Sequence, residues 1–277
     1  MQQNPSKNIL PHLCWIALLA WALFPFFNQA NAQTRAQNAQ IYLEKVLPHE
    51  KNPLMQTDPE FMQIKNAFVF NDIPKIIHLN EKTRFLIQIV TLTVTQNLNH
   101  LPPYIKMALN SGVLANEIKE AIYQTAPYIG IEKTESALLI INPIIQNNII
   151  HLPLLPQSKT NDQTRFEKGK EKQIEIFGKK NTESMEQNTI LNLLSSYCFG
   201  DFYTRGVLDL KTRELLTFAI LVALGDAQNQ IQEHIQGNFN LGNTQQNLMD
   251  TLFIMLPHIG FPRIFNALSL IQNFEKK

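Results

Sequence analysis

Cysteine is nearly absent from this sequence of 277 residues. Only Cys14 and Cys198 occur, and Cys14 lies inside an apolar N-terminal stretch that we expect to be removed from the mature protein. A chain left with one thiol cannot form an internal disulfide, so a disulfide-stabilised scaffold is excluded. Two interpretations of Cys198 stay open, a buried core residue or a reactive thiol.

The sequence also lacks an excess of charge of either sign. It has 24 Lys and Arg against 23 Asp and Glu, and Lys7 is the single charged residue among the first 32. Without that segment, 23 basic residues balance 23 acidic ones. A neutral surface argues against nucleic acid or an anionic membrane as the main partner.

Motifs that hold metals or phosphates, or that activate a serine, are missing as well. The histidines are scattered, without the His-x3-His or Cys-x2-Cys spacing of a metal site. There is no Gly-rich phosphate loop and no Gly-x-Ser-x-Gly turn. The sequence therefore predicts no metal site and no nucleotide-binding loop.

Long apolar runs are limited to one, at residues 13–27. It follows Lys7 and precedes Ala30-Asn31-Ala32, a small-x-small cleavage pattern, which is typical of a secretory signal peptide. An uncleaved N-terminal anchor is the alternative. We expect residues 1–32 to be the signal peptide of an exported protein, periplasmic or secreted, with no membrane contact after cleavage.

Signals for β-strands are almost absent, whereas helical patterns repeat along the chain. Residues 66–96 match residues 195–225 without a gap, and the match resumes after a loop that is one residue longer in the second copy. The recurring residues include Lys82-Thr83-Arg84 and Lys211-Thr212-Arg213, Asn110-x-Gly112 and Asn240-x-Gly242, and Pro127-x-Ile129-Gly130 and Pro257-x-Ile259-Gly260. The fold class is predicted as all-α, a tandem duplication of one helical unit. We place the first unit at 33–150, a linker at 151–164 and the second unit at 165–277.

The most informative stretch is Leu208 to Gly242. Asp209 is a predicted N-cap of an apolar helix that begins with Glu214 and ends before Gly225. A second helical pattern follows and carries His234. In the first unit the equivalents of these two residues are Phe85 and Tyr104, so an acid–base site is predicted for the second unit alone, and the first is predicted to keep only its fold.

Four motifs of the second unit resemble the carboxymuconolactone decarboxylase family, within the alkylhydroperoxidase D-like superfamily. These motifs are Tyr197-Cys198-Phe199-Gly200-Asp201-Phe202-Tyr203, Lys211-Thr212-Arg213-Glu214-Leu215-Leu216, His234-Ile235-Gln236-Gly237 and Pro257-His258-Ile259-Gly260-Phe261-Pro262. The resemblance implies an alkylhydroperoxidase D-like helical unit that assembles into homo-oligomers, trimers or hexamers, with no metal or organic cofactor. The first unit shows the resemblance more weakly.

The resemblance further implies a relay in which a Glu opens the buried helix, cysteines open the next one and a His follows one turn later. Glu214 and His234 match the Glu and the His. The loop from Gly225 to Asn229, where a family cysteine would lie, has no sulfur. Because a thiolate is what attacks a peroxide, the peroxidase activity of some family members is opposed. Cys198 could substitute only if the fold brings it next to His234.

Two functions from different classes follow. The favoured one is a cofactor-free lyase or isomerase that acts on a small organic acid or lactone, with Glu214 and His234 catalytic and with Phe199, Phe202, Tyr203 and Arg213 contacting the substrate. The other is a non-catalytic helical binding or assembly module. Both candidate catalytic residues also have structural alternatives: Glu214 can favour the helix dipole, and His234 can be a core histidine.

Several further polar residues are open to interpretation. Arg84 and Arg213 recur in both units, which favours structural roles, and we expect them to pair with Asp72 and Asp201 respectively. His258, Asp226 and Glu233 are weaker candidates for the same cleft as His234.

Overall fold

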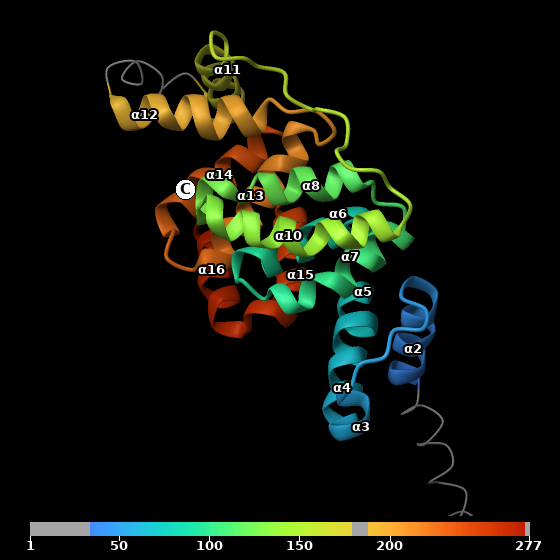
Figure 1. Cartoon of the computed structure of the whole chain (residues 1–277). Coiled ribbons are helices and arrows are strands. Elements are labelled where there is room, and N and C mark those ends of the chain that lie inside the picture. The colour runs from blue at the N-terminus through green and yellow to red at the C-terminus, as the bar shows by residue number, and fades with distance from the viewer. Residues whose placement is uncertain (1–33, 179–187, 275–277) are drawn as a thin grey trace, which may run out of the picture.

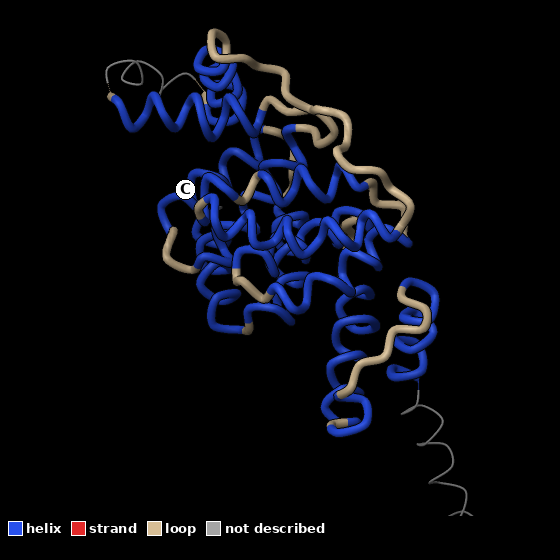
Figure 2. Tube along the Cα trace, viewed as in Figure 1, coloured by secondary structure: helices blue, strands red, loops and turns tan. Residues whose placement is uncertain are grey.

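The computed structural model describes residues 34–178 and 188–274, and that part of the chain consists of helices and loops without a strand (Figure 2). The expected signal peptide at 1–32 lies outside these residues. None of the described helices is both long and apolar enough to cross a membrane. The all-α prediction is confirmed.

The two units share their main helices, and the first unit has additional short ones. In the first unit the helices are α2 (Thr34–Val46), α3 (Leu54–Thr57), α4 (Pro59–Ala67), η1 (Phe68–Asp72), α5 (Ile73–Ile76), α6 (Glu81–Val94), η2 (Leu98–His100), α7 (Leu101–Asn110), α8 (Ala115–Tyr123), α9 (Ala126–Ile129) and α10 (Ile131–Asn147). In the second they are α11 (Arg165–Phe177), α12 (Thr189–Leu193), η4 (Leu194–Tyr203), α13 (Leu210–Leu224), α14 (Gln228–Asn240), α15 (Gln245–Ile259) and α16 (Phe261–Phe274).

The buried helices begin and end where the sequence predicts. The Asp209 carboxylate accepts a hydrogen bond from the backbone N–H of Thr212 at 2.7 Å, and Asn80 caps α6 in the same way. Gly225 takes the left-handed conformation that ends α13, with φ of 92°. The predicted helix end at Gly225 is therefore confirmed, and Gly242, after α14, also has a positive φ, of 80°.

The first helices of the two units, α2 and α11, occupy equivalent places. The side-chain amide of Asn110 donates to the carbonyl of Val46, the last residue of α2, at 2.9 Å. The equivalent Asn240 donates to the carbonyl of Ile176 near the end of α11 at 2.8 Å. The Asn-x-Gly motif therefore fixes the end of α11 beside α14, and this position proves important for the site.

An aromatic-rich segment in each unit is wound as a π-helix, η1 in the first unit and η4 in the second. In the second unit α11 crosses η4 at two glycines. A side chain on Gly169 would collide with the carbonyl of Ser195, and one on Gly200 would collide with the carbonyl of Arg165. Backbones approach this closely only where a Cβ is missing, so these glycines set the distance between α11 and η4.

One hydrophobic core runs through both units, with α6 and α13 at its centre and α15 against α6. In Figure 1 these helices lie in the body of the molecule, whereas α2 to α4 project at one side and α11 and α12 lie at another. Continuous burial across the repeat boundary means that neither unit completes its core alone.

A buried ion pair joins the units beside this core. Arg213 is fully buried and donates to the Glu120 carboxylate of the first unit at 3.0 Å. Arg205 binds the same carboxylate. The expected pairing of Arg213 with Asp201 is therefore wrong.

The first unit departs from the expectation in the same way. Arg84 pairs with Glu81, not with Asp72. The two aspartates instead bind arginines of the first helix of their own unit, Arg35 with Asp72 and Arg165 with Asp201. The sequence comparison aligned the residues correctly but could not show which charge lay nearest in space.

Candidate active site

The two candidate catalytic side chains meet. His234 Nδ1 lies 2.5 Å from Glu214 Oε1. Glu214 is fully buried in the second turn of α13, and His234, on α14, keeps 7% of its surface exposed. The structural alternative for Glu214, an exposed carboxylate at the helix dipole, therefore does not apply. A buried carboxylate bonded to a histidine is the arrangement that fixes an imidazole tautomer and stabilises its protonated form.

A glycine one turn along α14 makes this contact geometrically feasible. A Cβ on Gly237 would lie 2.5 Å from Glu214 Oε1 and 2.7 Å from Ile176 Cγ2. Any larger residue would displace the carboxylate or push α11 away. The equivalent residue in the first unit is Met107, which is 1% exposed, so its side chain fills the space that the second unit gives to the carboxylate.

The second carboxylate oxygen faces a group of hydroxyls. Tyr203 Oη donates to Glu214 Oε2 at 3.3 Å and is also bonded to the Thr217 hydroxyl. Tyr128 Oη, from the first unit, lies 3.1 Å from Tyr203 Oη. Burial raises the pKa of both tyrosines well above the ordinary value, so both hydroxyls stay protonated and available as donors.

Aromatic rings enclose the histidine. Phe177, the last residue of α11, meets the His234 ring edge-on with centroids 5.2 Å apart. Phe199 packs against Phe177 at 6.1 Å and against Tyr203 at 4.8 Å. These rings give the pair an apolar wall, in which electrostatic interactions are stronger than in water.

The four predicted substrate-contacting residues are divided by the fold. Phe199 and Tyr203 lie beside the Glu214–His234 pair. Phe202 is half-buried and packs against Tyr197. Arg213 is turned to Glu120 in the other unit, so its guanidinium is occupied in holding the units together.

The remaining polar candidates lie elsewhere. Asp226 and Glu233 are exposed. His258 contacts Tyr104 of the first unit, with ring centroids 5.4 Å apart. Burial, reinforced by the positive charge of Lys65, lowers the pKa of His258 to about 4, so this histidine is neutral at pH 7.

Cys198 is buried and does not contact His234. Its thiol donates to Tyr128 Oη at 3.7 Å. Burial raises the pKa of the thiol to about 12, so at neutral pH it is not the thiolate that peroxide reduction needs. The buried-core interpretation of Cys198 is the one that the structure supports.

Sequence reasoning missed four residues of this site: Phe177, Gly237, Asn238 and Tyr128. The Asn238 side chain donates to the backbone carbonyls of both Glu214 and His234, at 3.1 and 2.7 Å, and so holds α13 and α14 in register. The motif His234-Ile235-Gln236-Gly237 contained a signal for Gly237, because an unexplained glycine inside a helix indicates a close approach. Nothing in the sequence pattern indicated that Tyr128 or Phe177 lies in this site.

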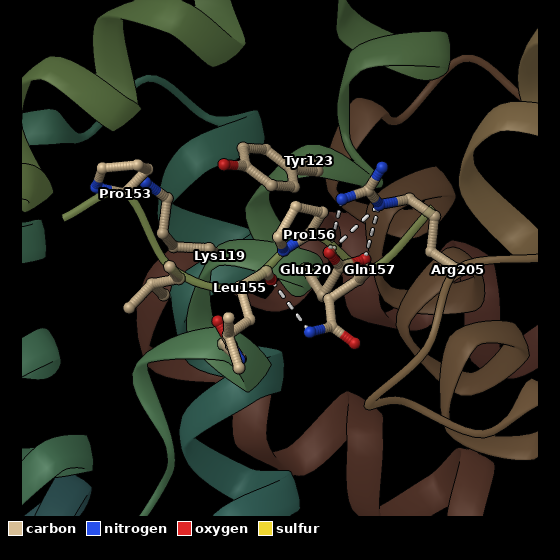
Figure 3. A pocket seen from close by; sticks show the side chains of 10 residues that line it. Lys119, Glu120, Tyr123, Pro153, Leu155, Pro156, Gln157 and Arg205 are labelled. Atoms are coloured by element: carbon tan, nitrogen blue, oxygen red, sulfur yellow. Dashed lines mark hydrogen bonds and ion pairs between the residues drawn. The ribbon is translucent and has the colours of Figure 1, made fainter. Parts of the chain in front are cut away.

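A cavity of about 120 Å³ lies away from the Glu214–His234 pair, between α8 and the linker (Figure 3). It is lined by residues that include Lys119, Tyr123, Pro156 and Arg205, and the Arg205–Glu120 ion pair closes one side. In the described ranges, 34–178 and 188–274, no cluster of three or more His, Cys, Asp or Glu could hold a metal ion.

Comparisons with known proteins agree with this description. The sequence pattern of the carboxymuconolactone decarboxylase family matches residues 59–142 and 189–273, once in each unit. The 4-carboxymuconolactone decarboxylase of Acinetobacter baylyi is 27% identical over 122 residues, which are 90% of that protein and 42% of this chain. A crystal structure of a putative gamma-carboxymuconolactone decarboxylase subunit from Burkholderia xenovorans shares the fold, with a TM-score of 0.54 at 18% identity over 87% of this chain and 98% of that one. On the strength of the two family matches, the chain belongs to the carboxymuconolactone decarboxylase family.

Proposed function

We propose that the second unit is a cofactor-free acid–base site that decarboxylates a small carboxylate-bearing lactone or organic acid. One observation carries this proposal, the bond between His234 Nδ1 and the buried Glu214 carboxylate. Among the described residues His234 Nε2 has no bonded partner, and the ring is 7% exposed. The imidazole therefore presents Nε2 as its reactive atom.

The chemistry requires one proton. When the bond between the substrate carbon and its carboxylate breaks, carbon dioxide leaves and the electron pair stays on the substrate, where an unsaturated lactone shares it among conjugated carbons. Protonated His234 then delivers the Nε2 proton to one of these carbons, and solvent restores the proton on the ring. Glu214 stabilises the imidazolium before transfer and holds the ring in place. In an isomerisation the neutral ring would instead remove a proton from carbon and return it at another atom.

The relatives support the reaction class. The curated Acinetobacter relative is a decarboxylase by name, and its 27% identity makes the precise substrate of this chain part of the proposal. Peroxidase activity is the less favoured alternative, because the loop Gly225–Asn229 has no sulfur and the Cys198 thiol stays protonated. Export to the periplasm or medium, and assembly into homo-oligomers, remain proposals that accompany this function.

One observation favours the non-catalytic alternative, a binding or assembly module. Glu214 is 0% exposed and the cavity beside α8 does not include either member of the pair. Phe177 packs against the His234 ring, which is 7% exposed, so little of the ring is open to a substrate. The experiment must therefore distinguish an active enzyme from a folded protein in which the histidine–carboxylate pair is formed but no substrate reaches it.

The test is turnover of a panel of carboxylated lactones, beginning with 4-carboxymuconolactone, followed by carbon dioxide release. In D₂O the product should carry one deuterium, at the carbon that takes up the proton. We expect His234→Gln to lower kcat by ~10²–10⁴-fold, the usual contribution of an acid–base group, with helical content unchanged.

His100→Gln is the matched control, because His100 is an exposed histidine of the first unit, and this variant should keep wild-type turnover. Equal turnover in wild type and His234→Gln would overturn the mechanism. Absence of turnover across the panel, with the Glu214–His234 pair intact by NMR, would favour the binding module.

A further inference from the structure

Tyr128 belongs to the first unit but contacts the site of the second. It lies on α9, in the Pro127-x-Ile129-Gly130 motif, and its hydroxyl is 3.1 Å from Tyr203 Oη. The equivalent residue of the second unit, His258, lies against Tyr104, the equivalent of His234. This motif therefore reaches across to the opposite unit in both halves.

The hydrogen bonds around Tyr203 have a defined direction. Tyr203 has one hydroxyl proton, and it is donated to Glu214 Oε2. In the Tyr128–Tyr203 bond, Tyr128 must then be the donor. The Cys198 thiol donates in turn to Tyr128, so the donors of this chain are all aimed at the Glu214 carboxylate.

A second branch arrives from the same unit. The Gln124 side-chain amide donates to Thr217 Oγ1 at 2.9 Å. With its own proton, Thr217 donates to Tyr203, whose proton is already committed to Glu214. Both Gln124 and Tyr128 belong to the first unit, and both branches end on one carboxylate oxygen. Chains of aligned donors polarise one another and strengthen the final bond.

We propose that the first unit, through the hydroxyl of Tyr128, positions the Glu214–His234 pair of the second unit, so that the two units form one site. The inference rests on the proposed function of that pair. Tyr128 touches neither His234 nor a substrate; it acts through Tyr203. Its donated bond polarises the Tyr203 hydroxyl and so strengthens the bond by which Tyr203 holds Glu214 Oε2.

The other groups around the Glu214–His234 pair could also affect the NMR signals of His234. Tyr203 and Cys198 come from η4, and Tyr128 comes from α9. The α11 helix contributes Ile176 and Phe177, which are apolar. Arg213, the residue before Glu214 on α13, is paired with Glu120.

The test is NMR of His234 in the full chain at one fixed pH, read from the chemical shifts of its imidazole nitrogens, in wild type, Tyr203→Phe and Tyr128→Phe. Removing a donor changes the charge that the Glu214 carboxylate presents to the imidazole through their bond. We expect these chemical shifts to change most in Tyr203→Phe, and in the same direction by a smaller amount in Tyr128→Phe. Thr217→Val, which interrupts the Gln124 branch, should change them in the same direction.

Tyr104→Phe is the matched control, because Tyr104 is a buried tyrosine of the first unit outside this network, and it should leave the imidazole chemical shifts of His234 unchanged. In the turnover assay Tyr128→Phe should lower kcat by ~3–10-fold, with KM unchanged.

If the imidazole chemical shifts in Tyr128→Phe coincide with those in Tyr104→Phe, the proposal is overturned. If Tyr128→Phe does not fold, Tyr128→Met, which also removes the hydroxyl and keeps an apolar side chain, decides the outcome by the same measurement. The chemical shifts are measured on resting protein, so they can support this inference even when no lactone is turned over. The failure of the proposed reaction and the failure of the positioning role are therefore distinguishable.

Discussion

The two units place different residues on the same helices. In the second, Glu214 and His234 form a buried polar pair beside Gly237. In the first, the equivalent positions of the pair hold Phe85 and Tyr104, both buried. Where the second unit has a carboxylate, a histidine and a gap between helices, the first fills the equivalent volume with side chains.

The residues that the two units share have the same structural roles in both. Asn80 and Asp209 both cap the buried helix, and Asn110 and Asn240 both hold the end of the first helix of their unit. These residues specify the scaffold, so they recur in a unit that lacks the carboxylate and the histidine. A few differences at buried positions are enough to give equivalent helices an apolar filling in one unit and a polar pair in the other.

The largest expected contrast is between the two buried arginines. We expect Arg213→Met to lower the free energy of unfolding by ~3–5 kcal/mol, because Glu120 and two loop carbonyls lose a fully buried donor. Arg84→Met should cost only ~1 kcal/mol, since Glu81 is 40% exposed. Urea unfolding of both variants measures the difference. Equal losses would show that the buried Arg213–Glu120 pair contributes no more to stability than the partly exposed Arg84–Glu81 pair.

His258 gives the next largest effect, and it depends on pH. Its folded-state pKa of about 4 lies below the ordinary 6.5, so the unfolded chain takes up the proton first. Stability is therefore complete above pH 6.5 and is lost as the pH falls towards 4, by ~2 kcal/mol for a half-buried ring. His258→Tyr, which copies the residue at Tyr128, should flatten this part of the stability–pH curve. If the stability of His258→Tyr falls from pH 7 to 4 with the same slope as that of the wild type, His258 is not the group responsible for this loss.

Gly237→Ala should fill the gap between helices that the second unit has and the first unit lacks. The added Cβ meets Glu214 and Ile176, and we expect a loss of ~1–2 kcal/mol, with overpacking partly offset by the higher helix propensity of Ala. The NMR signal of His234 should shift as the carboxylate moves. Gln236→Ala, at an exposed neighbour on the same helix, is the control. If neither the free energy of unfolding nor the NMR signal of His234 changes, α11 moves aside without a measurable cost and the close contact at Gly237 is not required.

The smallest effects should be equal in the two units. Asp209→Ala and Asn80→Ala each remove one cap bond to a backbone N–H and should each cost ~1 kcal/mol. Thermal or urea unfolding of the pair of variants tests whether the scaffold has stayed equivalent. A clear difference between them would show that the units have diverged in their scaffold as well as in their chemistry.

Local features of the sequence predicted much of this structure. The N-cap at Asp209, the helix end at Gly225 and the repeat itself depend on residues close together in the chain, and all are confirmed. Glu214 and His234 were identified from their positions on two consecutive helices and from a family resemblance. The structure then showed that the two side chains meet.

What sequence reasoning missed depends on contacts between distant segments. The partner of Arg213 is Glu120, 93 residues earlier in the chain, and a charge pattern does not reveal which of several carboxylates lies nearest. Phe177 reaches His234 only because α11 and η4 cross closely at glycines. Tyr128 enters the site from the opposite unit, which no pattern within the second unit could indicate.

The exchange of Tyr128 and His258 between the halves has a consequence for symmetry. Two identical single-unit chains related by a two-fold axis must present the same residue at both crossing positions. Here one crossing position holds a hydroxyl that donates towards Glu214, and the other holds a neutral histidine against Tyr104. Joining the units in one chain allows each position to change alone. The two units thus differ from each other as the subunits of a heterodimer do. Because one chain joins them, they cannot separate or assemble into the wrong pair.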